Sequence, residues 1–458
     1  MPDFGGTLHS LRDYYNNGAT LSYQFRRKQL LLLRAAIEKY EEEINEALYS
    51  DLKKSKEEVW ATETGLLISE INHTLSNLKK WMKPKKIGTD LVTFPSSAKI
   101  YKEPLGVVLI IAPWNFPLQL LLIPLVGAIA AGNCAVLKPS EMAPATESIT
   151  AKIIEETFPE NYIKVINGNG AEVVPPLTNQ FRFDHIFYTG STVTGKEIYK
   201  LAANGLIPVT LELGGKSPCI IYDDANMKVA AKRIVLGKFF NAGQTCIAPD
   251  YALVQESVKE KFMSEVKNSI LQFYSDDASS SYNYGKIINE KRFDKLITYM
   301  TPENIFYGGS YNREELYIEP TVLKNISVEN DIMKEEIFGP VLPVLSFTTT
   351  EQAMNMMKQN EQPLSFYLFT SNKKIEKEWI YKTQFGGACI NNTAWHFTNK
   401  RMPFGGIGNS GIGAYHGKNT FDVFSHAKPV LKTSTAIDIS LKYPPFKNKL
   451  GLFKKLIR

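Results

Sequence analysis

Strand-like and helical runs alternate along residues 104–211, and this alternation restricts the possible folds more than any other feature of the chain. Repeated β-α-β units of this kind build a parallel sheet that is covered by helices. Such sheets bind nucleotides at the carboxyl ends of their strands. The predicted strands are 107–112, 134–138, 163–167, 185–189 and 209–213, and the predicted helices lie near 118–131, 144–157, 170–178 and 192–204.

The length of the chain indicates further domains. A chain of 458 residues is too long for one ordinary core, so two or three subdomains are expected. Apolar residues recur at helical spacing along residues 7–82, and the sequence Lys-Pro-Lys-Lys at 83–86 ends this helical pattern. Two extended runs, 91–94 and 99–101, are predicted to pair with each other. A second alternating region runs from about 214 to 392.

Composition and charge exclude several classes of protein. A net charge of +6 with 22% charged residues is a globular balance, and it is too mild to indicate a nucleic-acid partner. Four cysteines lie far apart without metal-ligand spacing, so we expect no metal site and no disulfide framework. Cysteines that are few and widely spaced fit a protein of a reducing compartment. The first residues lack a basic region followed by an apolar run, so no secretory signal is expected, and the predicted location is cytoplasmic.

The segment 105–137 carries no charged residue, so it has to be weighed as a membrane span. A span needs about 20 continuous apolar residues. Pro113, Pro117 and Pro124 interrupt this segment, and Trp114-Asn115 lies within it. These interruptions favour a buried strand, loop, helix and strand over a membrane-spanning helix.

Three glycine- or lysine-containing turns are candidates for holding a nucleotide. No complete Gly-x-Gly-x-x-Gly is present, and the lone Gly-x-Gly at 168–170 predicts a turn. The run 190–195 follows a predicted strand and opens a helix, where backbone N–H groups suit a pyrophosphate. An ordinary Ser/Thr helix cap explains the same residues. Lys138 and Glu141 follow another strand, where they suit ribose hydroxyls or simply form a solvated turn.

Cys246 carries the strongest chemical signal. The sequence Phe-Phe-Asn-Ala-Gly-Gln-Thr-Cys at 239–246 places a thiol on a glycine-containing loop after a helical segment. A thiol is nucleophilic enough to form a covalent intermediate. The alternative is a small buried residue, which is the usual role of cysteine. That alternative suits Cys134, Cys219 and Cys389, which lie in apolar runs.

Two further side chains suit the chemistry of a thiol nucleophile. Glu212 ends an apolar strand, and partial burial there would raise its pKa toward that of a general base. The alternative is a surface glutamate at a turn. Asn115 stands between two prolines, where a rigid amide donor suits an oxyanion. The alternative is a turn-forming asparagine.

These motifs occur together in one order, and together they resemble the aldehyde dehydrogenase superfamily over essentially the whole chain. The residues after the thiol (247–251) and the glycine-rich run 403–411 with Tyr-His-Gly-Lys at 415–418 resemble its class 3 branch. The ordered motifs are Pro-Trp-Asn-Phe-Pro (113–117), Lys-Pro-Ser-Glu (138–141), Gly-Ser-Thr (190–192), Leu-Glu-Leu-Gly-Gly-Lys (211–216), Gly-Gln-Thr-Cys (243–246) and Glu-Glu-Ile-Phe-Gly-Pro (335–340).

The resemblance implies a role for each matching residue. Cys246 attacks an aldehyde, the Asn115 amide and the Cys246 backbone N–H hold the oxyanion, and Glu212 activates the water that releases the acid. NAD is the implied cofactor, since Glu141 should repel a 2′-phosphate, although class 3 members often accept NADP as well. The implied cofactor-binding residues are Trp114, Lys138, Ser140, Glu141, Gly190, Ser191, Leu213, Gly214, Glu336 and Phe338.

The resemblance also implies an aldehyde dehydrogenase-like α/β fold with two parallel-sheet domains and a β-strand oligomerisation arm. Class 3 members are usually homodimers, so the resemblance implies a homodimer. The implied division is a cofactor domain from 1–82 and 104–211, a catalytic domain at 212–391, an arm from 83–103 and 392–430, and a basic tail at 431–458.

The basic tail is a candidate for peripheral membrane contact. Phe446, Leu450, Phe453 and Ile457 fall on one helical face, and lysines surround them. Such a segment can lie on an anionic membrane surface, which would suit an apolar aldehyde. The alternatives are packing on a partner subunit and a tail without fixed structure. Class 3 resemblance and the apolar tail favour medium- or long-chain, aromatic or polyene aldehydes.

Two other functions compete with hydrolytic aldehyde oxidation. Transfer of the acyl group to coenzyme A needs no deacylating base, so Glu212 argues against it. A non-catalytic binding or structural protein with this fold is the other alternative. The intact set of Cys246, Glu212 and Asn115 argues against that one.

Overall fold

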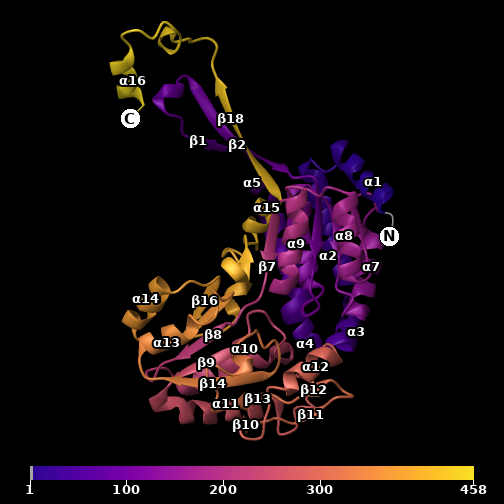
Figure 1. The fold of residues 1–458 in the computed structure, drawn as a ribbon. Coiled ribbons are helices and arrows are strands. Elements are labelled where there is room, and N and C mark those ends of the chain that lie inside the picture. The colour runs from indigo at the N-terminus through magenta and orange to yellow at the C-terminus, as the bar shows by residue number, and fades with distance from the viewer. Residues whose placement is uncertain (1–3, 458) are drawn as a thin grey trace.

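Two parallel sheets and a projecting β-arm organise the chain in a computed structural model, which describes residues 4–457 (Figure 1). The first three residues of the predicted segment 1–82 and the last residue of the predicted tail lie outside the described part. Helices cover the sheets, and the arm extends away from both lobes (Figure 1). The predicted α/β class with two parallel-sheet lobes is confirmed.

The first sheet has the strand order β17-β7-β6-β3-β4-β5. Its five sequence-predicted strands are parallel to one another, and only β17 runs antiparallel, beside β7. The four predicted helices are present with nearly the predicted bounds. The elements are β3 (Val107–Ile111), α6 (Gln119–Ala131), β4 (Cys134–Lys138), α7 (Pro144–Thr157), β5 (Ile163–Val165), α8 (Gly170–Gln180), β6 (His185–Thr189), α9 (Thr192–Asn204), β7 (Val209–Glu212) and β17 (Gly411–Ile412).

The charge-free segment forms β3, α6 and β4 in the centre of this lobe. Every residue of α6 is buried, so its apolar surface faces protein on all sides. Within residues 4–457, no helix has the length and apolar character needed to cross a membrane.

The N-terminal helices pack against this sheet and its helices. Their apolar positions, such as Leu30, Leu33 and Ile37, are fully buried, as the helical spacing predicts. A short π-helical turn, Trp60–Thr64, interrupts the series. The helices are α1 (Gly5–Asn16), α2 (Tyr23–Lys39), α3 (Glu41–Leu52), α4 (Lys56–Val59) and α5 (Gly65–Trp81).

The second sheet has the order β10-β13-β14-β9-β8-β15-β16 and a separate core. All its strand pairs are parallel except β10 with β13. The elements of this lobe are β8 (Pro218–Ile221), α10 (Met227–Phe239), β9 (Tyr251–Gln255), α11 (Lys259–Tyr274), α12 (Glu290–Ile297), β10 (Ile305–Tyr307), β13 (Thr321–Leu323), β14 (Val341–Phe347), α13 (Thr350–Met357), β15 (Ser365–Phe369), α14 (Lys373–Lys382) and β16 (Gly387–Ile390). The strands β11 (Tyr311–Asn312) and β12 (Tyr317–Ile318) form a separate two-stranded hairpin.

The arm is a three-stranded antiparallel sheet, β1-β2-β18. It consists of β1 (Lys85–Ile87), β2 (Ser96–Pro104) and β18 (Ser425–Thr433), and α15 (Lys418–Val423) leads into it. The prediction that 91–94 is extended and pairs with 99–101 is wrong, because residues Leu91–Thr93 form a 3-10 turn. Both edges of β2 are already paired, with β1 and β18, so no edge is left for this run.

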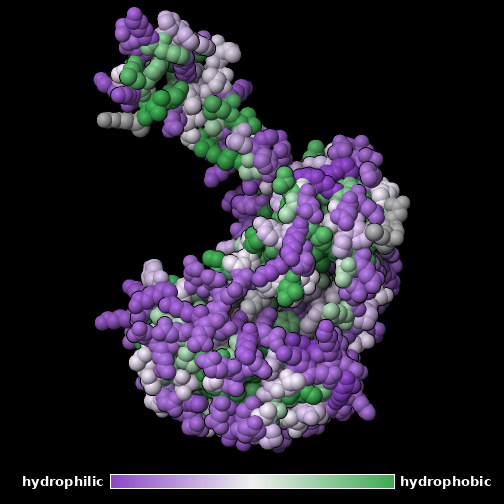
Figure 2. All heavy atoms as spheres, viewed as in Figure 1, coloured by the Kyte–Doolittle hydropathy of each residue, from purple (hydrophilic) through white to green (hydrophobic). Residues whose placement is uncertain are grey.

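Apolar side chains are exposed on the arm and the tail beyond it (Figure 2). Leu91 is 77% exposed, and Phe94, Leu431 and Leu450 are also exposed. The tail helix α16 (Leu450–Leu456) is shorter than the helix predicted to carry Phe446, Leu450, Phe453 and Ile457 on one face. Phe446 therefore lies before the helix. The Phe446 ring still contacts Phe453, with centroids 5.8 Å apart.

Candidate active site

The loop that carries Cys246 follows α10 and has an unusual backbone. Asn241, Ala242 and Gly243 all have positive φ angles, of 49°, 50° and 75°. A side chain at position 243 would meet the Gly339 carbonyl oxygen at 2.2 Å, so only glycine fits there. Non-glycine residues in this conformation concentrate at functional sites, where the surrounding structure holds them.

Cys246 lies where two cavities meet. It lines both of them, together with Glu212 and Leu213. Burial, followed by the nearby carboxylates of Glu336 and Glu212, raises the pKa of the Cys246 thiol to about 12. A thiol with a pKa in this range is mostly protonated at neutral pH.

The first cavity is almost entirely apolar. Aromatic side chains from distant parts of the chain form its wall, and Trp395 on its lining is 56% exposed. The wall includes Phe116, Leu120, Leu236, Phe240, Ile247, Phe397, Phe404 and Tyr415. A cavity of this composition suits an apolar ligand.

The second cavity is more polar and opens at the carboxyl ends of the first sheet's strands. Its lining draws together residues from several turns that are far apart in sequence. Among the predicted cofactor-binding residues it contains Trp114, Gly190, Ser191, Leu213, Gly214, Glu336 and Phe338. This is the position at which parallel α/β sheets bind nucleotides.

Ser191 immediately precedes α9, and its side chain caps the helix by accepting a hydrogen bond from the Thr194 N–H. The cap and an anion site are compatible, because the cap satisfies only one of the free backbone N–H groups of the first turn. Thr192 and Val193, in the first turn of α9, also line the polar cavity.

Glu212 is the last residue of β7, and its side chain is 2% exposed. Neither carboxyl oxygen has a hydrogen-bond partner among the described residues. Burial raises the pKa of Glu212 well above the ordinary carboxyl value. A buried carboxyl group of this kind, beside a thiol and lining both cavities, is a candidate for proton transfer.

Asn115 lies in the turn after β3 and is buried. Its side-chain Nδ2 donates one hydrogen bond to the Gln244 carbonyl oxygen at 3.0 Å, which leaves the second N–H of the amide for another acceptor. The Asn115 carbonyl oxygen accepts hydrogen bonds from Lys54 Nζ and Asn241 Nδ2, both at 2.9 Å.

Lys138, Ser140 and Glu141 lie at the end of β4 and do not line either cavity. Lys138 Nζ lies 3.1 Å from Glu141 Oε2, and the Gly170 N–H donates to the other Glu141 oxygen at 3.1 Å. Ser140 Oγ accepts from the Met142 N–H. These residues share the sheet edge with the polar cavity, because β4 neighbours β3.

Glu336 and Phe338 also line the polar cavity, next to Gly214 and Trp114. A side chain on Gly214 would meet Glu336 Oε2 at 2.0 Å, so the carboxylate lies directly over that glycine. Burial, followed by Asp250, raises the pKa of Glu336 to about 8. The Phe338 ring meets Trp114 edge-on, with centroids 5.2 Å apart.

Several residues that shape the site had no assigned role in the sequence. Lys216 Nζ lies 2.5 Å from Asp250 Oδ2 and donates to the Glu335 carbonyl oxygen at 2.9 Å. Asp250 also accepts from the Ile337 N–H, so the pair holds the loop that carries Glu336. Arg292 donates to the carbonyl oxygens of the same loop and lines the polar cavity.

Within residues 4–457, no three His, Cys, Asp or Glu side chains gather as a metal-binding group. The four cysteines are all free, and Cys134 and Cys219 are buried in β4 and β8. The lone Gly-x-Gly at 168–170 lies at the start of α8. Gly170 is the first residue of the helix, and the Asn169 side chain caps it.

Comparisons with known proteins identify the family. The family model described as "Aldehyde dehydrogenase family" matches residues 12–430. The chain belongs to the aldehyde dehydrogenase family. It is an enzyme that oxidises aldehydes, and its cofactor is NAD or NADP.

Individual relatives cover nearly the whole chain. A 4,4'-diaponeurosporen-aldehyde dehydrogenase of Staphylococcus aureus is 44% identical over 98% of each chain. An aldehyde dehydrogenase family 3 member B1 of Rattus norvegicus is 41% identical over 98% of this chain and 96% of its own. The solved substrate-bound state of Staphylococcus aureus AldH has a TM-score of 0.98 at 43% identity and covers all of both chains. The predicted class 3-like branch of the aldehyde dehydrogenases is confirmed.

Proposed function

We propose that this aldehyde dehydrogenase converts an apolar aldehyde to its carboxylic acid through a thioester on Cys246, which is then hydrolysed. The observation that carries this proposal is the position of Cys246 and Glu212 at the junction of an apolar and a polar cavity. The apolar cavity takes the aldehyde chain, and the polar cavity takes the nicotinamide cofactor. The thiol stands between them.

Each residue then has a step that its surroundings suit. The Cys246 thiol releases its proton to solvent as its sulfur bonds to the carbonyl carbon. The free N–H of the Asn115 amide and the Cys246 backbone N–H donate to the resulting oxyanion. A nicotinamide held in the polar cavity would supply the hydride acceptor, and loss of the hydride from the carbon bonded to Cys246 leaves a thioester on the sulfur. Glu212 takes a proton from water, the hydroxide adds to the thioester carbon, and the acid leaves as the thiol is restored.

The residues of the polar cavity fit a dinucleotide. Gly214 leaves room for Glu336, whose carboxylate would accept from the hydroxyls of the nicotinamide ribose, with Phe338 beside the ring. Ser191 and the start of α9 would hold the pyrophosphate. Lys138, Ser140 and Glu141 would hold the adenosine ribose. A negative Glu141 at that ribose opposes a 2′-phosphate, so we propose NAD as the preferred cofactor.

The substrate class follows from the apolar wall. A polyene, aromatic or medium- to long-chain aldehyde would bury its chain against Phe116, Phe240 and Phe404. The relative named as a 4,4'-diaponeurosporen-aldehyde dehydrogenase supports the polyene member of this set. Transfer of the acyl group to coenzyme A remains the second candidate, and formation of NADH from aldehyde without coenzyme A separates the two.

The exposed apolar arm supports a homodimer. Leu91, Phe94 and Leu431 are exposed on this narrow projection, which a second subunit would cover (Figure 2). The free cysteines fit a cytoplasmic location. Peripheral membrane contact through the basic tail stays a proposal. Deletion of 446–458 should abolish sedimentation with anionic vesicles, and binding that survives the deletion would remove the tail as the anchor.

A further inference from the structure

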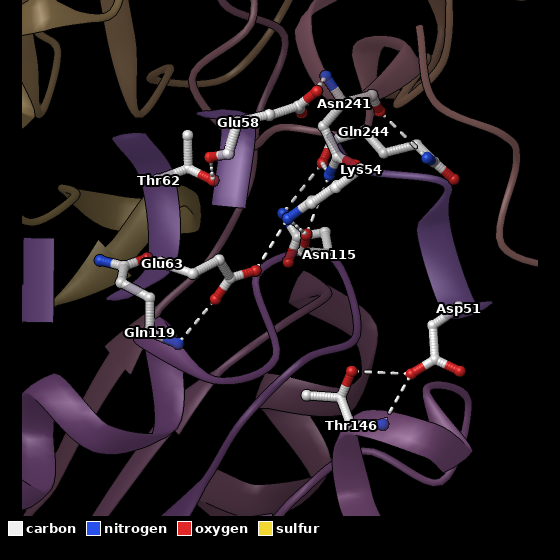
Figure 3. Close-up of polar contacts among 10 residues, drawn as sticks. All are labelled: Asp51, Lys54, Glu58, Thr62, Glu63, Asn115, Gln119, Thr146, Asn241 and Gln244. Atoms are coloured by element: carbon white, nitrogen blue, oxygen red, sulfur yellow. Dashed lines mark hydrogen bonds and ion pairs between the residues drawn. The ribbon is translucent and has the colours of Figure 1, made fainter. Parts of the chain in front are cut away.

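A buried ion pair lies beneath the turn that carries Asn115 (Figure 3). Lys54 Nζ is 2.8 Å from Glu63 Oε1, and both side chains are 0% exposed. Burying two charges is costly, so a pair of this kind persists where further hydrogen bonds satisfy it. The partners of those further hydrogen bonds indicate what the pair does.

Lys54 holds the backbone of Asn115 itself. Its ammonium donates to the Asn115 carbonyl oxygen at 2.9 Å and lies 4.1 Å from the centroid of the Phe116 ring. Asn241, from the loop that carries the thiol, donates to the same carbonyl oxygen. The turn is therefore held from the N-terminal helices on one side and from the thiol loop on the other.

Glu63 holds the other end of the same turn. Its second oxygen accepts from the Gln119 N–H, the first residue of α6, at 2.8 Å. A carboxylate at a helix N-terminus also suits the helix dipole. Glu63 belongs to the π-helical turn Trp60–Thr64, a rare geometry that is often found at functional sites. The ion pair thus fixes residues 115–119 at both ends.

The segment that supplies this pair also holds the thiol loop. Glu58 accepts a hydrogen bond from the Asn241 N–H at 3.1 Å, in the left-handed stretch before Cys246. Gln244, within that loop, accepts from Asn115 through its carbonyl oxygen. Residues 54–63 therefore contact both the turn that carries Asn115 and the loop that carries Cys246.

Neither Lys54 nor Glu63 lines either cavity, so neither can touch substrate or cofactor. We propose that Lys54 and Glu63 are positioning residues that aim the Asn115 amide at the oxyanion formed on Cys246. This inference rests on the proposed function of Asn115. Since one N–H of the amide is held by Gln244, the direction of the other depends on the backbone that Lys54 fixes.

The test compares two rates on the intact enzyme. One is kcat/KM for aldehyde oxidation, which needs the oxyanion donor. The other is alkylation of Cys246 by iodoacetamide, which forms no oxyanion. Lys54→Met should lower kcat/KM by about 10- to 100-fold, since displacement of a catalytic group by about 1 Å can cost 100-fold. Alkylation should stay within about threefold of the unsubstituted rate, because the thiol itself is not displaced.

A double variant separates positioning from stability. Lys54→Met with Glu63→Leu removes both charges of the pair together, and apolar replacement of a buried pair is often neutral for stability. Its thermal unfolding should be close to that of the unsubstituted protein, while kcat/KM stays low. Glu63→Gln keeps an acceptor for Gln119 and should lose less than Lys54→Met does.

The matched control lies at the other end of α6. Arg26 is a buried cation that donates to the Ala130 carbonyl oxygen at 3.1 Å, near the end of that helix. Arg26→Met should lower stability and leave kcat/KM of the folded protein within about threefold, because it removes a buried cation without touching the turn.

A folded double variant whose kcat/KM lies within threefold of the unsubstituted value would overturn the inference. An alkylation rate that falls as much as kcat/KM would also overturn it. If Lys54→Met does not fold, the double variant decides by the same two rates. Failure of the proposed function looks different, because the unsubstituted protein would then form no NADH with any aldehyde.

Discussion

The Asn115 side chain donates a hydrogen bond to the Gln244 carbonyl oxygen at 3.0 Å, two residues before Cys246. The contact joins the turn after β3 to the thiol loop and leaves one amide N–H, which we propose donates to the oxyanion. Asn115→Ala should therefore lower kcat/KM by about 100- to 1000-fold, the usual cost of removing one oxyanion donor.

Asn115→Asp is the matched variant, since it keeps the size of the side chain but replaces the donor by an acceptor. It should be at least as slow, while alkylation of Cys246 by iodoacetamide continues. Steady-state kinetics that change by less than threefold in both variants would exclude the Asn115 side chain from the chemical step.

Glu212→Gln should separate acylation from deacylation. A glutamine cannot take a proton from water, so the first turnover should still form NADH while the steady-state rate falls by about 100-fold or more, the scale of general base catalysis. Rapid mixing measures the burst and the steady rate in one experiment. A steady-state rate equal to that of the unsubstituted enzyme would remove Glu212 from its role.

The same substitution should change the dependence of stability on pH. Because burial raises the pKa of Glu212, the folded protein binds this proton more tightly than the unfolded chain. The stability contributed by the protonated group is complete below the ordinary carboxyl pKa and is lost as the pH rises through the folded value. Glu212→Gln should therefore raise Tm more in alkaline than in acidic buffer, and an equal shift in both buffers would contradict the buried state.

The reactivity of the Cys246 thiol should rise steeply with pH. Its pKa is raised to about 12, so the thiolate fraction without cofactor should increase about tenfold per pH unit from pH 7 to 9. The rate of iodoacetamide alkylation of the cofactor-free enzyme, with Cys246→Ala as the blank, measures this. A plateau near pH 8 would mean that the free enzyme already holds a thiolate.

The apolar cavity should select aldehydes by chain length. Each buried methylene is worth about 0.8 kcal/mol, so kcat/KM should rise about fourfold per methylene until the chain fills the cavity. A series of linear aldehydes at fixed NAD measures the slope. A charge on the cavity wall, as in Leu236→Asp, should reduce this dependence on chain length. Tyr381 is exposed outside the cavity lining, so Tyr381→Asp serves as the control and should leave the dependence unchanged. No dependence on length would mean that the chain binds elsewhere.

The first lobe could be predicted closely because its signals are local. Short apolar runs between helical segments indicated β3 to β7 within a few residues, and parallel pairing follows from that order. The run 91–94 was mispredicted because its apolar residues suit a strand, whereas strand formation requires a free partner edge. That edge is a property of the assembled arm and not of the run itself.

The site could be predicted as far as its residues lie in compact motifs. Cys246, Glu212 and Asn115 each had a neighbouring glycine, strand end or proline that marked them, and the two cavities bring them together. Lys54 and Glu63 gave no such signal, because charged residues in a helical segment normally face water. Their complete burial depends on contacts with Asn115 and Gln119, more than 50 residues away in sequence.

NADH formation without coenzyme A tests the central claim most directly. The unsubstituted enzyme and Cys246→Ala are each mixed with NAD and a medium-chain apolar aldehyde, and NADH absorbance is followed through many turnovers. The unsubstituted enzyme should form NADH continuously with one equivalent of carboxylic acid per NADH, and Cys246→Ala should form none above background. Absence of NADH with every aldehyde, or an undiminished rate in Cys246→Ala, would contradict it.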